Sequence, residues 1–226
     1  MCAGIGSRMG KSLNSTPKSL LKYKSKTLLS YWIEKFDNEK NCKILINTHF
    51  KKEQFYNYFK KNNYNSEIIL TYEENLLGSL GTLIQNNEFI LDSKNFVVIY
   101  PDSYSEINLN KFIDFHNEKK ANFTMALNYV EDFKNSGIVS LDKDSKISYF
   151  VEKPLKTISK LASCGLYIFD TEFFKSKISS FDKNKILDIS KNFVTKNYLE
   201  NFYGYKIREK FYSIGTEKEY KIFFNL

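Results

Sequence analysis

The chain has 226 residues, enough for one domain with a substantial hydrophobic core, and its hydrophobic fraction of 42% excludes disorder over the whole chain. No run of about eighteen apolar residues predicts a transmembrane helix, and the first residues lack the basic and apolar regions of a secretory signal. Cys2, Cys42 and Cys164 form no CxxC pair, so neither a disulfide framework nor a zinc cluster is indicated. We therefore expect a cytoplasmic protein with reduced thiols.

The net charge of +8 results from 34 Lys and Arg residues against 26 Asp and Glu residues. Such a charge can indicate nucleic acid, an anionic membrane or anionic small substrates as partners. Acidic residues are spread along the chain, however, and no recognition motif accompanies the charge. We expect no nucleic-acid and no membrane partner. A nucleic-acid-binding module remains an alternative, and it predicts a steep salt dependence of binding.

Short apolar runs alternate with amphipathic segments in the first half of the chain. The runs predict strands at 43–47, 67–71 and 96–100. Helical spacing predicts helices at about 26–36, around Phe55 to Phe59, at 80–86 and from Leu109 to His116. Continuous apolar strands separated by helices indicate a mainly parallel sheet covered on both faces.

After about residue 120 the predicted strands come closer together, at 122–129, 137–141, 146–152 and 164–169. The last third adds two helices and a short strand pair near 204–213. We therefore expect one domain over 1–226. This arrangement looks like an α/β nucleotide-binding half over about 1–120, followed by a more strand-rich substrate-binding half over about 121–226.

The segment from Gly4 to Ser12 is similar to several phosphate-binding loops. The pattern GxxxxGK[ST] fits its end but requires glycine where Ile5 stands, and GxGxxG requires glycine where Met9 stands. Such a loop normally follows a strand, yet almost nothing precedes Gly4. A missing central strand would leave the backbone groups of its neighbours unpaired, which is costly.

A third pattern fits the same segment and extends beyond it. Gly4 and Gly6 lack a Cβ and let the backbone approach a triphosphate, while Arg8 and Lys18 bring two cations to the same anion. Gly6-Ser7-Arg8-Met9 followed by Pro17-Lys18-Ser19-Leu20-Leu21 resembles the GxGTRL loop and PKxLL segment of the sugar-1-phosphate nucleotidyltransferases.

Further blocks resemble the same family in the same order. They are Glu74–Leu83 (E-x-x-LLGTAGTL), Tyr100–Ser103 (a strand ending in the metal-binding Asp), Ser136–Val139 with Phe150–Pro154 (F-x-EKP), Ala162–Tyr167 (NAGIY) and Ser213–Thr216 with Glu219-Tyr220. The chain looks most like the mannose-1-phosphate and heptose-1-phosphate guanylyltransferase branch. This resemblance implies an α/β fold of GT-A-like type, with a Rossmann-like, mainly parallel mixed sheet flanked by helices and no C-terminal β-helix.

The resemblance also implies a reaction in which a sugar 1-phosphate attacks the α-phosphorus of a nucleoside triphosphate, most simply GTP, and pyrophosphate leaves. Such products supply capsule or other surface-glycan synthesis in the family. The implied catalytic residues are Arg8, Lys18 and Asp102, of which Asp102 would bind Mg²⁺. The implied nucleotide-binding residues are Ala3, Gly4, Gly6, Ser7, Arg8, Glu74, Gly78 and Thr82. Glu152, Lys153 and Gly165 would bind the sugar phosphate, and a homodimer follows by analogy.

Departures from the family pattern leave alternatives open. Ser213 stands where the family usually has a second metal-binding Asp, which also allows a catalytically impaired nucleotide-binding homologue. Cytidylyl, thymidylyl or uridylyl transfer by a protein of the same fold is an alternative. Lys18 could be a solvated loop cation, Asp102 a turn former and Glu152-Lys153 an exposed ion pair. His116, on an apolar helix face, is expected to be structural.

Overall fold

The computed structural model describes residues 1–4, 15–23, 25–37, 39, 42–131, 133–157 and 159–224. Gly6, Ser7 and Arg8 of the predicted phosphate loop lie outside the described residues. The chain divides into two compact units that alternate along the sequence. The first unit consists of residues 1–76, 100–105 and 211–226, and the second of residues 77–99 and 106–210. Whether they correspond to a nucleotide half and a sugar-phosphate half remains a prediction.

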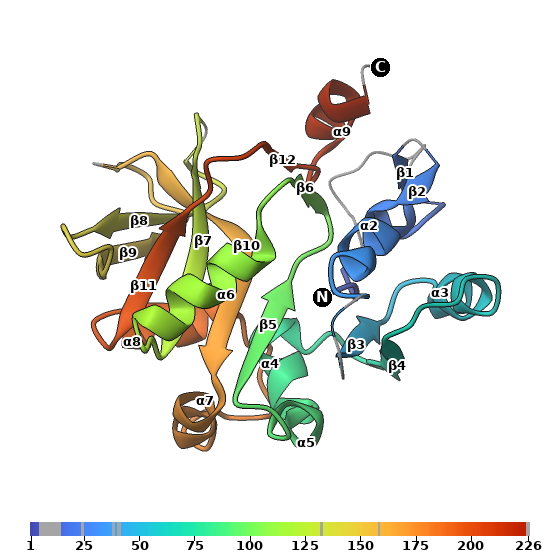
Figure 1. Ribbon diagram of the computed structural model, residues 1–226, viewed down its shortest axis with the longest axis horizontal. Coiled ribbons are helices and arrows are strands. Elements are labelled where there is room, and N and C mark those ends of the chain that lie inside the picture. Colours follow the sequence, from blue (N-terminus) through green and yellow to red (C-terminus); the bar gives the residue numbers. More distant parts are fainter. Residues whose placement is uncertain are drawn as a thin grey trace. The chain divides into compact units, whose positions relative to one another are not determined.

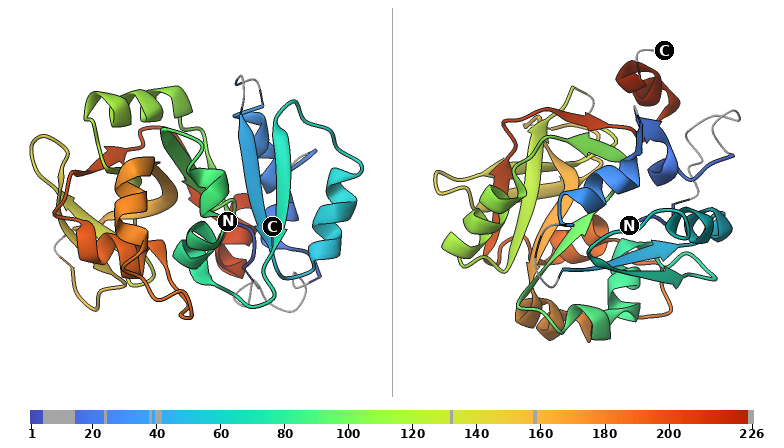
Figure 2. Two further views of the ribbon diagram at one scale, coloured as in Figure 1. Left: turned by 90° about the horizontal axis from the view of Figure 1, so that it is seen from below. Right: turned by 45° about the vertical axis from the view of Figure 1, so that its right-hand side comes forward.

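The first unit contains the parallel strand pair that the apolar runs predict. β3 (Lys43–Thr48) lies parallel to β4 (Glu67–Tyr72), and the connection between them contains α3 (Lys52–Phe59), as Figures 1 and 2 show. α2 (Leu28–Glu34) begins where Thr27 accepts a hydrogen bond from the Ser30 amide at 3.0 Å, a helix N-cap. Ahead of α2 come η1 (Lys18–Leu20), β1 (Lys22–Tyr23) and β2 (Lys26–Thr27).

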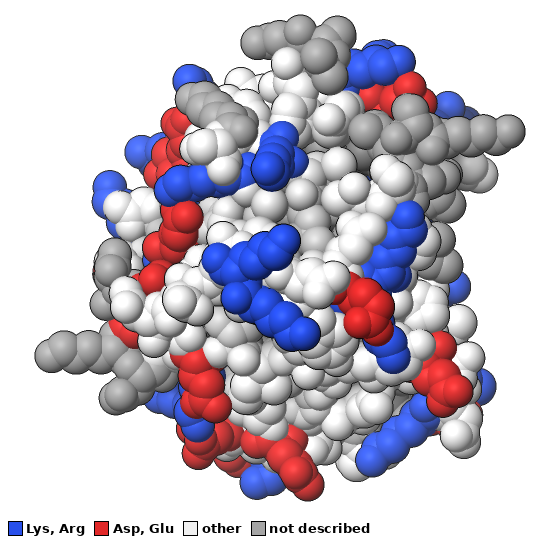
Figure 3. Space-filling view, turned by 90° about the vertical axis from the view of Figure 1, so that its right-hand side faces the viewer, with Lys and Arg blue, Asp and Glu red and all other residues white. Residues whose placement is uncertain are grey.

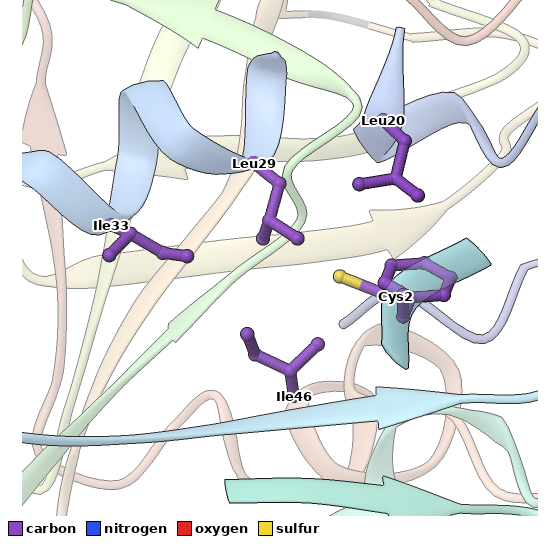
Figure 4. Packing of buried hydrophobic residues seen from close by; sticks show 6 residues of the cluster. Cys2, Leu20, Leu29, Ile33 and Ile46 are labelled. Carbon is purple, nitrogen blue, oxygen red and sulfur yellow. The ribbon is translucent and has the colours of Figure 1, made fainter. Parts of the chain in front are cut away.

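A hydrophobic cluster joins these elements. Figure 4 shows Cys2 among apolar side chains from η1, α2 and β3, and Phe55 of α3 completes the set. Its buried members are Cys2, Leu20, Leu29, Ile33, Ile46 and Phe55. Residues 1–4 are not in a strand, so the strand expected before the glycine loop is not seen among the described residues. The cluster nevertheless holds the amino end of the chain against the β3–β4 pair.

Two distant segments complete the first unit. β6 (Ser103–Ser105) pairs antiparallel with β12 (Phe211–Ser213), and α9 (Glu217–Phe224) follows. α9 starts with a capping box: Thr216 Oγ1 accepts from the Glu219 amide at 3.2 Å, and the Thr216 amide donates to Glu219 Oε2 at 2.8 Å. The ring centroid of Phe223 lies 4.4 Å from that of Tyr23, so α9 packs against β1.

The second unit is built on a six-stranded mixed sheet. Its strand order is β11-β7-β10-β8-β9, and β5 pairs antiparallel with residues 166–170 of β10. The strands are β5 (Asn95–Ile99), β7 (Phe123–Tyr129), β8 (Gly137–Leu141), β9 (Ile147–Glu152), β10 (Leu161–Asp170) and β11 (Phe202–Lys206). Only β7 and β11 pair in parallel here among the described strands, because β8, β9 and β10 follow one another without a helix between them.

Helices cover both faces of this sheet, as Figure 2 shows. On one face lies α6 (Leu109–Glu118), whose Phe112 packs against Tyr205 of β11. On the other lie α7 (Thr171–Ile178) and the π-helical turn η2 (Ile189–Val194), whose Phe193 packs against Phe202 of β11. Tyr205 and Phe202 are an odd number of positions apart, so the alternation of side chains along a strand places them on opposite faces. The unit also contains α4 (Gly78–Gln85), α5 (Asn87–Ile90) and α8 (Thr195–Asn197).

The α/β class with a mixed, helix-flanked sheet is confirmed, and most predicted elements match within a few residues. The predicted strand pair near 204–213 is wrong as a pair. β11 and β12 both exist, but β11 pairs with β7 and β12 pairs with β6. Three helical segments, rather than two, follow β10: α7, η2 with α8, and α9. Every helix in the described part of the chain is too short or too polar to cross a lipid bilayer.

Candidate active site

The first unit brings together two of the three predicted catalytic residues. Lys18 Nζ lies 3.8 Å from Oδ2 of Asp102 and donates a hydrogen bond of 2.7 Å to the carbonyl oxygen of Gly215. The Lys18 side chain is 15% exposed and that of Asp102 is 39% exposed, so the cation is largely enclosed while the carboxylate stays accessible. Lys18 is therefore held by the protein and is not a solvated loop cation.

Backbone contacts fix the position of Asp102. Its carbonyl oxygen accepts from the Ile214 amide at 2.9 Å, next to the β6–β12 ladder. Ser103 Oγ donates to the Tyr100 carbonyl at 3.0 Å and closes the turn that contains Pro101 and Asp102. Asp102 is thus part of a turn, and its carboxylate also faces a cation.

The amino end of the chain lies in the electrostatic neighbourhood of Asp102. Burial raises the pKa of the Cys2 thiol, and the Asp102 charge acts in the same direction. The Cys2 amide donates to Asn47 Oδ1 at 2.7 Å, and Asn47 Nδ2 donates to Glu73 Oε1 at 2.7 Å. This chain of hydrogen bonds holds Cys2 in place. Ala3 beside it is buried, whereas Gly4 is exposed.

The donors near Asp102 limit how a divalent cation can bind. No group of three or more His, Cys, Asp or Glu side chains in the described part of the chain could hold a metal ion. Ser213, on the strand beside β6, is exposed and offers a neutral hydroxyl. A single accessible carboxylate is compatible with a Mg²⁺ ion that binds together with the substrate phosphates. This ion commonly takes one or two protein carboxylates as ligands, with phosphates and water completing its coordination.

The predicted nucleoside contacts fall into different surroundings. Glu74 is exposed in the first unit. Gly78 has φ of +75°, and a Cβ there would lie 2.4 Å from the carbonyl oxygen of Leu187. Thr82 is 2% exposed and its hydroxyl donates to the Gly78 carbonyl at 3.1 Å. Gly78 and Thr82 therefore make intramolecular contacts at the start of α4, and their nucleoside contact remains a prediction.

The predicted sugar-phosphate residues lie in the second unit, at the end of β9. Burial raises the pKa of the Glu152 carboxyl; Lys153 opposes this effect and Asp188 adds to it. Glu152 lies opposite Gly137, where a Cβ would come within 2.8 Å of Glu152 Oε2. Lys153 is exposed with φ of +51°, so the backbone turns sharply as it leaves the strand.

Gly165 lies at an irregularity in β10. Its φ is +72°, and the register with β7 shifts between Ser163 and Tyr167. The shift leaves hydroxyl groups close together: Tyr167 Oη lies 2.9 Å from Ser163 Oγ and 3.4 Å from Ser190 Oγ. Burial, partly offset by these hydrogen bonds, raises the pKa of Tyr167 to about 12, and Glu152 acts in the same direction as burial. The charge of Glu152 therefore acts on a largely buried group of neutral hydroxyls.

The sequence analysis did not single out two acidic residues, Glu73 and Asp188. Glu73, 3% exposed, ends the hydrogen-bond chain from Cys2, and the His49 ring lies 2.8 Å from its carbonyl oxygen. Its place after a predicted parallel strand was an available signal, since functional groups gather at such strand ends. Asp188 accepts a hydrogen bond of 3.2 Å from Ser79. Its role depends on a long-range contact that no local motif reveals.

Figure 3 shows the distribution of charge on one face of the molecule. Asp and Glu side chains lie between the Lys and Arg side chains on this face. On this face, acidic side chains therefore separate the basic ones.

The chain belongs to the nucleotidyl transferase family, whose model matches residues 1–218. It is 28% identical to a protein of Sulfolobus acidocaldarius named putative mannose-1-phosphate guanyltransferase, over 87% of this chain and 52% of that protein. It is also 31% identical to a glucose-1-phosphate adenylyltransferase of Clostridium acetobutylicum, over 62% of this chain and 39% of that protein. The chain thus spans about half or less of the length of these curated relatives.

Solved structures show the same fold. HddC from Yersinia pseudotuberculosis complexed with GMP-PN matches with a TM-score of 0.78 and 20% identity, covering 99% of this chain and 96% of that one. A putative glucose-1-phosphate thymidylyltransferase from Bacillus anthracis matches with a TM-score of 0.86 and 18% identity, covering 99% of this chain and 92% of that one. Both matches cover nearly the whole of each chain.

Proposed function

We propose that this protein is a sugar-1-phosphate nucleotidyltransferase that joins a nucleoside triphosphate to a sugar 1-phosphate. The observation that carries the proposal is the Lys18–Asp102 pair, in which an enclosed cation lies 3.8 Å from an accessible carboxylate. In a chain of the nucleotidyl transferase family, this pairing provides one group for a phosphate and one for a metal ion.

In the proposed reaction a phosphate oxygen of the sugar 1-phosphate attacks the α-phosphorus of the triphosphate. A new P–O bond forms, and the bond between the α-phosphorus and the bridging oxygen to the β-phosphate breaks. Pyrophosphate leaves with that electron pair. The nucleophile is already an anion, so no general base is needed, and the demand is for positioning and for cations that stabilise the developing charge.

The residues of this chain have distinct roles in the proposal. Lys18 binds the triphosphate, with Arg8 and the backbone of Ala3, Gly4, Gly6 and Ser7 around it. Asp102 holds Mg²⁺, which when bound to the phosphates neutralises charge there. Glu152 accepts hydrogen bonds from sugar hydroxyls, and Lys153 binds the sugar phosphate beside Gly165.

GTP with mannose 1-phosphate or heptose 1-phosphate is the substrate pair that we favour. The motif wording supports it, and so does the name of the Sulfolobus relative. The Clostridium relative is named as an adenylyltransferase and other structural neighbours as uridylyl- or thymidylyltransferase-type proteins, so the choice of base needs a direct test.

Pyrophosphate release with a panel of triphosphates and sugar 1-phosphates, in the presence and absence of Mg²⁺, tests the proposal. We expect turnover with one pair to exceed that with the others, and each product to be an NDP-sugar by mass spectrometry. Folded protein that turns over none of the pairs would contradict an active transferase.

A second candidate function keeps nucleotide binding without efficient turnover. Ser213 favours it, because a neutral hydroxyl replaces an acid that could share the metal ion with Asp102. Calorimetry that detects Mg²⁺-independent nucleotide binding, together with no pyrophosphate release, would support this alternative. Turnover that depends on Mg²⁺ would exclude it.

A further inference from the structure

The segment around Leu187 crosses the amino-terminal end of α4. The Leu187 amide donates to the Leu77 carbonyl at 2.8 Å, and the Leu187 carbonyl accepts from the amides of Leu80 at 2.8 Å and Gly81 at 3.1 Å. These amides belong to the first turn of the helix, whose donors have no partner within the helix itself. The 187–189 segment therefore acts as an external cap for α4.

A side-chain link lies directly beside this backbone link. Ser79 Oγ donates to Asp188 Oδ1 at 3.2 Å and accepts from the Ile189 amide at 2.9 Å. The Asp188 amide in turn donates to Asn192 Oδ1 at 2.7 Å, which fixes the backbone at the start of η2. The Ser79 hydroxyl thus links the start of α4, where the nucleoside contacts are predicted, to the 187–189 segment. It does so by one hydrogen bond that it donates and one that it accepts.

The segment that follows Asp188 packs beside the predicted sugar residue. η2 packs against β9, which ends at Glu152, and Ser190 Oγ of η2 lies 3.4 Å from Tyr167 Oη of β10. Burial is the largest influence that raises the pKa of Glu152; the Asp188 charge acts in the same direction and Lys153 opposes it. All of these residues belong to the second unit.

We infer that Asp188 is a positioning residue that links the two substrate segments: it holds the start of α4 through Ser79, and it directly precedes η2, which packs against β9, the strand that ends at Glu152. The inference rests on the proposed function for the names of the two substrates. Its geometry depends on the contacts of Ser79, Asp188 and Ile189 and on the packing of η2 against β9. The hydrogen bond and the charge of Asp188 are two separate properties, so they can be removed separately.

Asp188→Asn keeps an oxygen that accepts from Ser79 and removes the charge. We expect the pKa of Glu152, followed by NMR of ¹³C-carboxyl-labelled glutamate without any substrate, to fall in this variant, because a neighbouring negative charge is gone. Binding of the favoured triphosphate by calorimetry should stay unchanged. A Glu152 pKa equal to that of the wild type would overturn the electrostatic part of the inference.

Ser79→Ala removes the link and keeps both charges. Ser79→Ala loses both hydrogen bonds of the hydroxyl, and we expect triphosphate binding to weaken by about tenfold, with no change in the pKa of Glu152. Asp188→Ala should show both effects. Wild-type triphosphate affinity in both Ser79→Ala and Asp188→Ala would overturn the positional part.

Asp182→Asn is the matched control, because Asp182 is an exposed acid on the same connection and pairs with Lys185. It should change neither quantity. Thermal melting of every variant separates a local effect from a loss of folding. Neither readout requires turnover, so an absence of transferase activity would contradict the proposed function while the Glu152 titration still decides the link to Asp188.

Discussion

Lys18 Nζ and Oδ2 of Asp102 lie 3.8 Å apart although Lys18 belongs to the 1–76 segment of the first unit and Asp102 to its separate 100–105 segment. A partly exposed ion pair of this kind adds only about 0–1 kcal/mol to folding stability. We therefore expect the pair to matter for ligand binding more than for stability. The two partners should consequently show large effects on activity and small effects on unfolding.

Lys18→Ala should lower kcat/KM by about 100-fold or more, the scale on which single groups that stabilise transition-state charge act. Its unfolding free energy should change little. Lys22→Ala is the control, since Lys22 is exposed four residues further along. Steady-state pyrophosphate release measures both variants. Equal losses in the two would show that general positive charge, and not the placement of Lys18, matters.

Asp102→Asn should weaken the Mg²⁺ dependence of triphosphate binding. The amide keeps the size of the side chain, and the backbone bond from Ile214 to the residue 102 carbonyl remains. We expect the Mg²⁺ concentration needed for half-maximal binding to rise by about tenfold or more, as for other changes at metal sites. Asp114→Asn, on an exposed position of α6, is the control. A Mg²⁺ titration that does not move would remove Asp102 from the metal site.

Ser213→Asp should have the opposite effect. A second carboxylate on β12, the strand that pairs with β6 beside Asp102, would offer Mg²⁺ another oxygen ligand. We expect triphosphate binding to need less Mg²⁺, measured by the same titration. An unchanged titration would show that position 213 does not face the metal ion.

Gly78→Ala should destabilise the protein by about 1–3 kcal/mol. Alanine is strained at φ of +75°, and its Cβ would lie 2.4 Å from the Leu187 carbonyl oxygen. Gly4→Ala is the control for stability, because a Cβ at Gly4 meets nothing within 4 Å. Urea unfolding compares the two. A Gly78→Ala midpoint equal to that of the wild type would show that the Leu187 segment yields easily.

His116 should make the protein less stable as the pH falls from about 6.5 to about 4. Burial lowers its pKa to about 4, and its Nδ1 lies 2.8 Å from Thr124 Oγ1. In this interval the unfolded chain binds a proton that the folded chain does not, so acidification favours unfolding by up to roughly 3 kcal/mol. Denaturation of the wild type and of His116→Asn over this range should differ in slope. Parallel curves would rule out His116 as the titrating group.

Local patterns predicted most of the elements, whereas long-range pairing and site contacts came only from the structure. The apolar runs at 43–47 and 67–71 correspond to β3 and β4 because burial of a strand on both faces produces such runs. β12 is short and finds its partner β6 from across the chain, so nothing near 204–213 could reveal that pairing. The predicted structural role of His116 is confirmed by its burial and its contact with Thr124.

The candidate site shows the same difference between local patterns, which the sequence displays, and long-range contacts, which it does not. The resemblance of residues 17–21 to the family's PKxLL segment singled out Lys18, and the family's strand that ends in a metal-binding Asp singled out Asp102. The link from Ser79 to Asp188 spans more than a hundred residues and depends on how the 187–189 segment crosses α4. Gly78 was predicted as a nucleoside contact from a motif, and the positive φ that it adopts is visible only in the backbone.

The return of residues 211–226 to the first unit has a consequence for truncated forms of the protein. This tail supplies both the strand beside Asp102 and the carbonyl oxygen that Lys18 contacts. A fragment ending at residue 210 would keep every catalytic candidate in its sequence and still lose the scaffold around two of them. Shortening the chain at its carboxyl end should therefore impair triphosphate binding as directly as a substitution at Lys18.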